Sequence, residues 1–581
     1  MQTLIAGCVE NNGAKSSSER SAKLPVLVVG GGPVGLGLAL ELALRDVKSV
    51  LLEQTDGVVR LSKMGHVSVR TMEHCRRWGV AESVRNCGFP PDYPLNQVFC
   101  TSLNAQHIAT LEFPPHSELA FNALSPEHKQ RCPQLWFDPI LARELSKHPQ
   151  ATIRNHARLI SFTQDESHVS ALVEDVRTGA RSTIAASYLV GCDGAGSTVR
   201  QQLGIKLSGD AVLSYSTGIY FTAPDLLKHH KMGAATRYWM VGEEGTWGNL
   251  TVVDAKHIWR LTITGSMERV EAENFDADYW VRRCLGRDDI EYSITAVLPW
   301  RRSRLVAERY REGRAFLAGD ACHINAPNGG YGMNTGIGDA VDLGWKLAAT
   351  LHGWGGAGLL DSYQKERKPI AQRNVNAAAA NFNSTRPKLS YLHVEEDTEE
   401  GAAARATIAR AMRENTRQEW ESDGVHLGYR YENSPIVIPD GTPEPEDKLT
   451  QYVPTARPGH RAPHFNLNGQ SIFDSFGSGF VLLCFTDQYD DMRVAALTNA
   501  AAKRAVPFVT QVIADPAAKV LYERRYVLVR PDGHVAWRSD TLDMEPAELL
   551  DIVSGRTDVR SSAPSAVHSK TTNSADAGGY T

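Results

Sequence analysis

The sequence lacks the features of a secreted, metal-stapled or nucleic-acid-binding protein. Its nine cysteines are an odd number and no two of them form a C-x-x-C pair, which argues against a disulfide framework and against a zinc site. Basic and acidic residues nearly balance, at 62 and 67, so the charge favours neither nucleic acid nor anionic lipid. We therefore expect no metal, no nucleic-acid partner and a reducing, cytoplasmic location.

Long hydrophobic runs are also scarce. The one stretch apolar enough to consider as a membrane span, residues 24–44, contains five glycines, proline and Glu41. A buried strand that turns into a buried helix explains this stretch better than a membrane span does. Residues 1–23 are polar and lack the basic start, apolar core and cleavage site of a signal peptide. We therefore expect no membrane association.

What the sequence does contain is typical of a large globular enzyme. Of its 581 residues, 42% are hydrophobic and 22% are charged, close to the average for folded domains, and the length allows several domains. Val26–Val29 and Ser49–Glu53 are short apolar runs on either side of a helical pattern over Gly35–Arg45. This arrangement predicts a βαβ unit with buried parallel strands.

A glycine-rich motif of the form G-x-G-x-x-G joins the first strand to the helix in this unit. It places backbone N–H groups and the positive end of the helix where a pyrophosphate binds. Glu53 ends the second strand, where its carboxylate can accept hydrogen bonds from a ribose. The sequence thus predicts a dinucleotide site, rather than a glycine turn kept only for packing. Its residues are Gly30, Gly32, Pro33, Val34, Gly35 and Glu53.

Two further motifs follow apolar strands. One runs from Gly191 through Asp193 to Arg200, and the other contains Gly319-Asp320 followed by the glycine-rich segment 327–334. With the first glycine motif, they make the chain resemble the single-component FAD-dependent aromatic hydroxylases, the class A flavoprotein monooxygenases that include p-hydroxybenzoate and phenol hydroxylases. The likeness covers about residues 24–376.

This resemblance implies a set of FAD-binding residues beyond the first motif. Asp193 and Arg200 would serve FAD and NADPH, and Asp320 would bind the ribityl chain, as its carboxylate chemistry allows. A helix that begins in segment 327–334 would point its N-terminus at the anionic edge of reduced flavin. Each position can instead be a turn or a helix cap. The residues implied are Arg70, Gln134, Asp193, Arg200, Asp320, Pro327, Gly332, Met333 and Asn334.

The resemblance also implies the reaction. NADPH or NADH would reduce FAD, O2 would form a flavin C4a-hydroperoxide, and one oxygen atom would pass to a small phenolic or related aromatic substrate. Two alternatives stay open: a Baeyer–Villiger oxygenase or epoxidase of the same fold, and an FAD-binding protein that does not oxygenate. A plain NAD dehydrogenase fits the motifs less well.

Substrate residues are harder to identify. His66 is a candidate base for a phenol, whose pKa is near ~10, although a lone histidine is more often structural. Tyr220, Trp239 and Trp247 lie in a stretch that predicts an antiparallel sheet, and they could line a pocket for a flat substrate or belong to the core.

We predict an α/β fold: a Rossmann-like, glutathione-reductase-like FAD domain over 24–376, with a mostly antiparallel substrate sheet inserted at about 90–140 and 206–300. Residues 377–450 would be a helical connector and linker, and 451–556 resemble the thioredoxin-like domain appended to phenol hydroxylase. Because Cys484 is the last cysteine and has no partner, that domain would be structural or would form a homodimer contact. Residues 1–23 and 557–581 are expected to be disordered.

Overall fold

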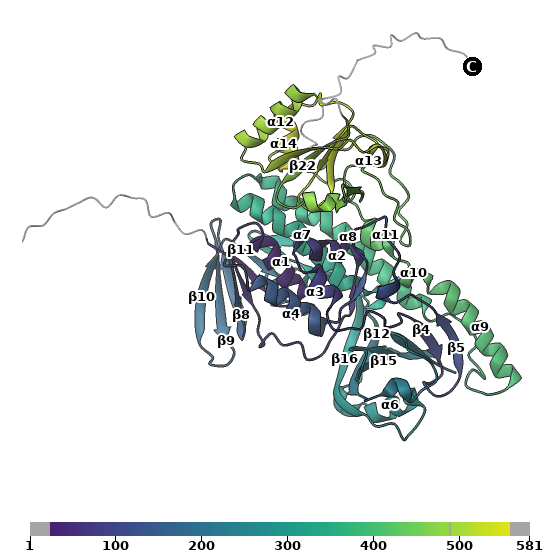
Figure 1. Ribbon diagram of the computed structural model, residues 1–581. Helices are drawn as coiled ribbons and strands as arrows, with labels where there is room; N and C mark the ends of the chain where they lie inside the picture. The colour runs from purple at the N-terminus through teal and green to yellow at the C-terminus, as the bar shows by residue number, and fades with distance from the viewer. Residues whose placement is uncertain (1–23, 487–489, 558–581) are drawn as a thin grey trace, which may run out of the picture.

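The computed structural model describes residues 24–486 and 490–557; the predictions of disorder for 1–23 and 557–581 fall outside these residues except at Thr557. Figure 1 shows a central α/β body with one sheet unit below it and another above it. Within the described ranges, no helix combines the length and the apolar character needed to cross a bilayer.

The predicted βαβ unit is present and forms the centre of the molecule. Strand β1 (Val26–Val29) pairs in parallel with β2 (Ser49–Leu52) and β11 (Tyr188–Gly191). Helix α1 (Pro33–Ala43) begins with proline at its first turn, which suits the fixed φ of that residue. The full sheet has the order β17 (Arg311–Glu312), β18 (Ala315–Leu317), β11, β1, β2, β7 (Ala151–Arg154).

Long helices cover this sheet. Helix α1 packs against α7 (Tyr331–Leu351) and α4 (Gln134–Leu145), and α7 packs against α8 (Ala357–Ser384). Helix α7 begins at Tyr331, within the segment where the sequence predicted a helix start, and follows Gly330, which lies in the left-handed region at φ 67°. A three-stranded sheet of β8 (Ala157–Gln164), β9 (Val169–Asp175) and β10 (Arg181–Ala186) lies beside the body (Figure 1).

The second large sheet has eight strands, and we call it the substrate sheet. It is mostly antiparallel, as predicted, but β13 and β4 pair in parallel because β4 comes from a distant part of the chain. Its order is β19 (His323–Ile324), β16 (Ser293–Ala307), β12 (Leu207–Thr222), β15 (Ile258–Ser266), β14 (Gly245–Val252), β13 (Arg237–Gly242), β4 (Gln97–Cys100), β5 (His107–Leu111).

The two faces of the substrate sheet differ sharply. One row of residues across the strands is buried, and we call it the core row. It is apolar apart from one tyrosine hydroxyl, and it consists of Val98, Tyr238, Leu250, Leu261 and Ile219. The neighbouring row points to the opposite face because successive side chains alternate. This polar row consists of Gln97, Arg237, Thr251, Arg260 and Tyr220.

The C-terminal unit is a four-stranded sheet of order β23 (Phe508–Val512), β22 (Phe480–Cys484), β24 (Tyr526–Val529), β25 (Val535–Ser539). Residues 530–534 form the turn that joins the antiparallel strands β24 and β25. Helices α12 (Asp491–Lys503), α13 (Pro516–Tyr522) and α14 (Pro546–Val553) belong to the same unit (Figure 1). The predicted linker at Ile438–Asp447 is bound to this sheet, since Ile438 N–H donates to the carbonyl of Ala536 and Asp440 pairs with Arg538.

Shorter elements connect these parts. They are β3 (His66–Val67), α2 (Val69–Arg77), α3 (Ala81–Arg85), β6 (Gln130–Arg131), α5 (Thr198–Gln202), α6 (Ala277–Leu285), α9 (Glu399–Asn415), α10 (Arg417–Trp420), α11 (Asp423–Leu427), β20 (Asn466–Leu467) and β21 (Gln470–Ser471), with 3-10 turns at His116–Glu118, Leu226–Lys228, Ala272–Asn274, Gly319–Ala321, Asn328–Gly330 and Ile472–Ser475.

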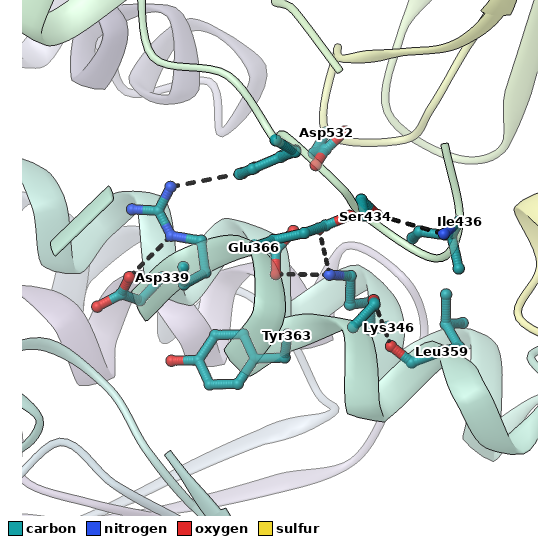
Figure 2. A network of polar contacts seen from close by, with 12 residues as sticks. Asp339, Lys346, Leu359, Tyr363, Glu366, Ser434, Ile436 and Asp532 are labelled. Carbon is teal, nitrogen blue, oxygen red and sulfur yellow. Dashed lines mark hydrogen bonds and ion pairs between the residues drawn. The ribbon is translucent and has the colours of Figure 1, made fainter. Parts of the chain in front are cut away.

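A buried ion network joins the C-terminal unit to the central body. Lys346 on α7 lies 2.6 Å from Glu366 on α8 and 2.8 Å from Asp342, and Figure 2 shows Lys346 and Glu366 facing each other. Arg530, from the β24–β25 turn, binds Glu366 at 2.7 Å and Asp532 at 2.7 Å. Burial raises the pKa of Asp342 well above its usual value. The two cations of this network, Lys346 and Arg530, face the carboxyl groups of Asp342, Glu366 and Asp532.

This balance predicts a large effect of Lys346→Met. The variant leaves Arg530 alone against Glu366 and Asp532 in a buried setting, and breaking such a network typically costs about 3–5 kcal/mol. Urea unfolding should show this loss. The control is Glu421→Gln, which removes an exposed pair with Arg417 and should change the free energy of unfolding by less than about 1 kcal/mol. Equal effects of the two substitutions would contradict a stabilising network.

Candidate active site

Three sequence motifs that are far apart in the chain meet at the start of α1. Val34 packs between Gly319 and Gly336, where an added Cβ would lie 3.0 and 2.6 Å from its Cγ2. On the other side, a Cβ at Gly30 would lie 2.4 Å from the carbonyl oxygen of Cys192. Gly30 also has φ 106°, a conformation that suits glycine. The structure therefore brings together the motifs that the sequence predicted as one site.

The start of α1 is open. A Cβ at Gly32 would meet no atom within 4 Å, and no side chain caps the helix, so its first N–H groups have no acceptor within the helix. Gly35 must stay small, because a Cβ there would lie 2.0 Å from the carbonyl oxygen of Gly30. Open space beside free N–H groups is the surrounding that a pyrophosphate requires.

Glu53 lies directly after β2, and protein N–H and O–H groups already use part of the hydrogen-bonding capacity of its carboxylate. Its carboxylate accepts hydrogen bonds from Gly31 N–H at 2.9 Å and from Thr55 N–H at 2.8 Å. These bonds orient the carboxylate next to the glycine motif. It also accepts from the Thr55 hydroxyl at 2.6 Å, so one of the roughly four acceptor positions of a carboxylate remains for a ribose hydroxyl.

Asp193 and Arg200 have structural partners of their own. Asp193 accepts from Val199 N–H at 3.1 Å and from the Ser197 hydroxyl at 2.5 Å, so it caps the short helix α5. Arg200 is buried rather than paired at the surface, and it donates to the carbonyl of Ala321 at 3.0 Å. It thereby ties the Asp193 segment to the Gly319-Asp320 segment.

Asp320 lies in an exposed position beside the start of α7. Protein atoms surround it closely enough that desolvation raises the pKa of its carboxyl group, yet its side chain stays accessible to solvent. Its Oδ1 would lie 3.9 Å from a Cβ at Gly332, so it points toward the start of α7. That helix has no side-chain cap, which leaves the first N–H groups available to a ligand. Gly332 and Met333 are half-buried there, and Pro327 is exposed.

Asn334 holds the neighbouring segment in place. Its Oδ1 accepts from Ser68 N–H at 2.9 Å and from the Thr71 hydroxyl at 2.7 Å, and its Nδ2 donates to the carbonyl of His66 at 3.2 Å. The side chain is therefore fully engaged, and only the backbone of Asn334 can meet a ligand. This agrees with the expectation that backbone groups of the segment face the cofactor.

Gln134 begins α4 and lies against the segment before His66. Its backbone N–H donates to the Ser62 hydroxyl at 2.9 Å, and its Nε2 donates to Asp138 at 2.9 Å. Asp138 is buried and its Oδ1 has no protein partner within the described chain. Burial raises the pKa of Asp138 to about 7.

His66 lies on β3 at the start of α7. A Cβ at Gly330 would lie 3.2 Å from its ring carbon Cδ2, and its ring centroid is 5.7 Å from that of His426. Burial, followed by His426 and nearby cations, lowers the pKa of His66 well below its usual value. His66 is therefore neutral at pH 7 and less basic than the base poised near pH 7 that the sequence hypothesis assumed.

Other predicted residues lie elsewhere. Arg70 pairs with Glu73 at 2.7 Å and donates to the carbonyl of Asp532 at 2.7 Å, so its guanidinium is committed to the contact with the C-terminal unit. Trp239 stacks on Phe99 in a cluster with residues of α9, whereas Trp247 packs against Trp280 on α6. The two tryptophans therefore do not line one pocket.

Tyr220 reaches the segment before His66, where its hydroxyl donates to the carbonyl of Ser62 at 3.1 Å. Sequence reasoning missed its companions on the polar row, Arg237 and Arg260, as well as Arg131 on β6. Strict alternation along β13–β15 could have indicated a polar face. Nothing local could have placed Arg131 beside it.

The fold also gathers a group that the sequence did not suggest. Ligand atoms of Cys322, His323 and Asp339 all lie within 4.8 Å of one another, although we expected no metal-ligand cluster. His323 Nε2 binds Asp339 at 2.7 Å and Arg367 Nε binds the same carboxylate at 2.8 Å. Burial raises the pKa of Cys322 well above its usual value, which disfavours the thiolate that a metal would need. His323, Asp339 and Arg367 therefore satisfy one another's hydrogen bonds.

The chain matches two known protein families in the same order as its structural units. Residues 23–378 match the FAD binding domain family, and residues 455–556 match the C-terminal domain of aromatic-ring hydroxylases. The chain therefore belongs to the FAD-dependent aromatic-ring hydroxylases, a class of flavoprotein monooxygenases. It is an FAD enzyme that uses NAD(P)H and O2. The open N-termini of α1 and α7 and the accessible Asp320 fit that cofactor.

Relatives match almost the whole chain. The tetracenomycin B2 monooxygenase-dioxygenase of Streptomyces olivaceus is 33% identical, with 92% of this chain and 98% of that protein covered. The 2,4-dichlorophenol 6-monooxygenase of Delftia acidovorans is 29% identical, with 88% and 94% covered. Among solved structures, the rebeccamycin biosynthetic enzyme RebC with reduced flavin is 39% identical, with a TM-score of 0.85 and 92% and 99% covered.

The buried Asp138 gives a pH-dependent prediction. Its carboxyl has a pKa of about 7 when folded, against about 3.9 in an unfolded chain. From about pH 4 to 7 the unfolded chain releases this proton and the folded chain keeps it. The free energy of unfolding therefore falls as pH rises through that window.

Asp138→Asn removes this loss. The free energy of unfolding of the variant should exceed that of the native protein by up to about 4 kcal/mol at pH 8 and by clearly less at pH 5. This figure follows from about 1.36 kcal/mol per pKa unit. Urea unfolding at the two pH values measures the difference. A gain of the same size at both would show that Asp138 is not the titrating group.

Proposed function

We propose that the protein hydroxylates a phenolic or related aromatic ring bound between the polar row of the substrate sheet and the start of α7. The observation that carries this proposal is the placement of Tyr220, which reaches from the polar row to the segment before His66. Two relatives support the substrate class by name, one a dichlorophenol monooxygenase and the other a tetracenomycin monooxygenase. The solved aklavinone-11 hydroxylase, 29% identical, was determined with FAD and aklavinone.

We assign roles to the site residues as follows. The α1 N-terminus with Gly30, Gly32 and Gly35 binds the pyrophosphate of FAD, and Glu53 binds the ribose. Asp320 accepts hydrogen bonds from the ribityl hydroxyls, and Gln134 lies beside the same chain. The backbone N–H groups of segment 332–334 stabilise negative charge on the ring system. When bound, FAD supplies the oxygen-transfer chemistry, and the protein supplies position and water exclusion.

His66 is placed to contact the hydroxyl of the substrate. A neutral imidazole accepts a hydrogen bond from a phenol and takes the hydroxyl proton as the ring of the phenol is oxygenated. The half-buried position beside Gly330 keeps this contact away from bulk water. The lowered pKa makes His66 a weak base, so its contribution should be modest.

We also infer that the C-terminal unit is a thioredoxin-like scaffold without redox activity. Its strand order places β22 between a parallel and an antiparallel neighbour, and Cys484 is buried and unpaired. The unit binds the central body through the buried Arg530 network rather than through cysteine chemistry. We further propose a cytoplasmic location, in line with the free cysteines, and a homodimer formed through this unit.

The test uses the purified yellow protein. NADPH and NADH oxidation is followed with a panel of phenols, hydroxynaphthalenes and cyclic ketones under 18O2, and the products are analysed by mass spectrometry. We expect one labelled hydroxyl on an aromatic ring, formed in step with NAD(P)H consumption. A lactone or epoxide product would instead identify the alternative oxygenases, and bound FAD without any labelled product would identify a protein that does not oxygenate.

Replacing His66 tests the proposed contact with the phenol. His66→Ala should lower kcat at pH 7 by about tenfold to a hundredfold, the lower part of the range for general base catalysis. Activity should recover as pH approaches the pKa of the phenol, near ~10, because the substrate then ionises without help. FAD content should stay unchanged. A pH–rate profile parallel to that of the native enzyme would assign His66 a structural role.

A further inference from the structure

Two cysteines lie side by side next to the segment that carries His66. Cys132 directly follows β6, and its N–H donates to the carbonyl of Gly65 at 2.9 Å. Cys87 follows α3, a helix that packs against β6, and its Sγ lies 3.6 Å from the carbonyl oxygen of Arg131. The two thiols hydrogen-bond to each other, and neither belongs to a disulfide. The fold thus brings together two thiols from separate parts of the chain.

Only one of these two thiols borders on a cavity. Cys87 is 9% exposed and lines a cavity of about 380 Å³ together with Trp136 and Arg143. The chain turns directly after it at Gly88, which has φ 101°, and a Cβ at Gly88 would lie 3.2 Å from the Trp136 ring. Cys132 has no exposed surface. A small molecule that enters this cavity therefore meets Cys87 first.

The surroundings of Cys87 favour its thiolate. A hydrogen bond from Cys132 lowers the pKa of Cys87 to about 7 against the opposing effect of burial, and the N–H of Phe89 and the charge of Arg131 add to the lowering. About half of Cys87 is then thiolate at neutral pH, whereas a free cysteine, with a pKa near ~8.5, is mostly thiol. The thiolate is the nucleophilic form of cysteine.

The other cysteines that the structure describes differ from Cys87. The pKa of each is raised, in Cys132 first by its hydrogen bond to Cys87 and in the rest first by burial. They are Cys75, Cys100, Cys132, Cys192, Cys284, Cys322 and Cys484. Within the described ranges, Cys87 is therefore the one thiol that combines access with nucleophilic character.

We propose that Cys87 and Cys132 form a peroxide-sensitive modification site, and that their oxidation to a disulfide slows the enzyme. Cys87 is the thiol that reacts, and Cys132 is the thiol that closes the disulfide. Hydrogen peroxide is the oxidant, and it is the two-electron reduction product of the O2 that this enzyme uses. The site lies on the cavity beside α3 and is separate from the residues assigned to FAD.

The reaction has two steps. The Cys87 thiolate attacks one peroxide oxygen and breaks the O–O bond, which leaves a sulfenic acid and a hydroxide that takes up the proton Cys87 had lost. The largest cause that raises the pKa of Cys132, its hydrogen bond to the Cys87 thiolate, is then gone. The Cys132 sulfur attacks the Cys87 sulfur, and the sulfenic oxygen leaves as water with the Cys132 proton. The two thiols lose two electrons and one peroxide gains them, which gives one disulfide and two water molecules.

The disulfide acts on the active site through β6. Arg131 and His66 are partners in the pairing of β6 with β3, and Gln134 N–H donates to the carbonyl of Met64 at 3.0 Å. Joining the two sulfurs at ~2.05 Å draws Cys132 toward the end of α3 and displaces the segment that these bonds hold. A shift of about 1 Å at a catalytic group can cost about a hundredfold in rate. This effect on rate rests on the role proposed above for His66.

The experiment treats the FAD-loaded enzyme with hydrogen peroxide at neutral pH. Peptide mapping without reductant identifies the oxidised cysteines, and NAD(P)H consumption with an accepted phenol gives the turnover. We expect a peptide cross-linked through Cys87 and Cys132, and Cys87 should react at least about tenfold faster than Cys484. Turnover should fall by at least about tenfold as the disulfide forms, and dithiothreitol should restore it. FAD content should stay unchanged.

Two variants separate the roles of the thiols. Cys87→Ser should keep the native turnover and lose the response to peroxide. Cys132→Ser should stop at the sulfenic acid of Cys87, which dimedone captures and mass spectrometry detects. The thermal midpoint shows which variants are folded, and peptide mapping of the native enzyme decides the case where Cys132→Ser fails to fold.

Cys100→Ser is the matched control. Cys100 also has a cysteine near it, since its charge acts on the thiol of Cys284, but both residues are 0% exposed and burial raises the pKa of both. This variant should form the Cys87–Cys132 disulfide and lose turnover as the native enzyme does.

Two results would overturn the proposal. One is a loss of turnover while Cys87 stays reduced or is oxidised without a bond to Cys132, because peroxide then acts elsewhere. The other is full conversion to the disulfide at unchanged turnover, which rejects the link to the active site. Product analysis separates this inference from the proposed function: a reversible disulfide that slows NAD(P)H consumption in a protein that forms no labelled product rejects only the hydroxylase.

Discussion

The fully buried carboxylate of Asp339 on α7 is the interaction on which the geometry of this enzyme depends. It accepts hydrogen bonds from the N–H of Gly319 at 3.1 Å, from His323 at 2.7 Å and from Arg367 on α8 at 2.8 Å. The loop that carries Asp320 is thereby fixed to the helix whose N-terminus lies beside Asp320. A buried carboxylate is costly unless its hydrogen bonds are complete, so the loop, the helix and α8 hold one relative position.

The C-terminal unit extends this arrangement. Arg367, which binds Asp339, also donates to the hydroxyl of Tyr431 at 3.4 Å, and the Tyr431 ring lies 4.3 Å from that of His534 next to the β24–β25 turn. The Arg530 network adjoins it, since Lys346 lies about two turns beyond Asp339 on α7 and Glu366 is next to Arg367 on α8. The unit therefore supports the helices that shape the proposed FAD site.

Local sequence signals predicted which motifs meet at the start of α1. The glycine motif, Asp193 and Asp320 each follow a short apolar strand, and parallel strands deliver their ends to the same edge of a sheet. The arginines near Tyr220 were not predicted, because Arg131, Arg237 and Arg260 come from three strands and meet only through pairing of distant segments. The contact of Arg70 with the carbonyl of Asp532 was not predicted for a similar reason, because that partner lies far along the chain. Tyr220 was identified, but only as one of several aromatic residues.

The two faces of the substrate sheet bear on how such enzymes diversify. Neighbouring residues on one strand, such as Tyr238 and Arg237, belong to the core row and to the polar row respectively. Every second residue of a strand lies on the polar face. A substitution there can thus change that face while the apolar layer that maintains the fold stays intact. Related enzymes can therefore evolve to accept new substrates through single substitutions on this face, without exchanging a domain. Exchange of a domain is difficult because β4, which comes from a distant part of the chain, pairs directly with β13 in this sheet.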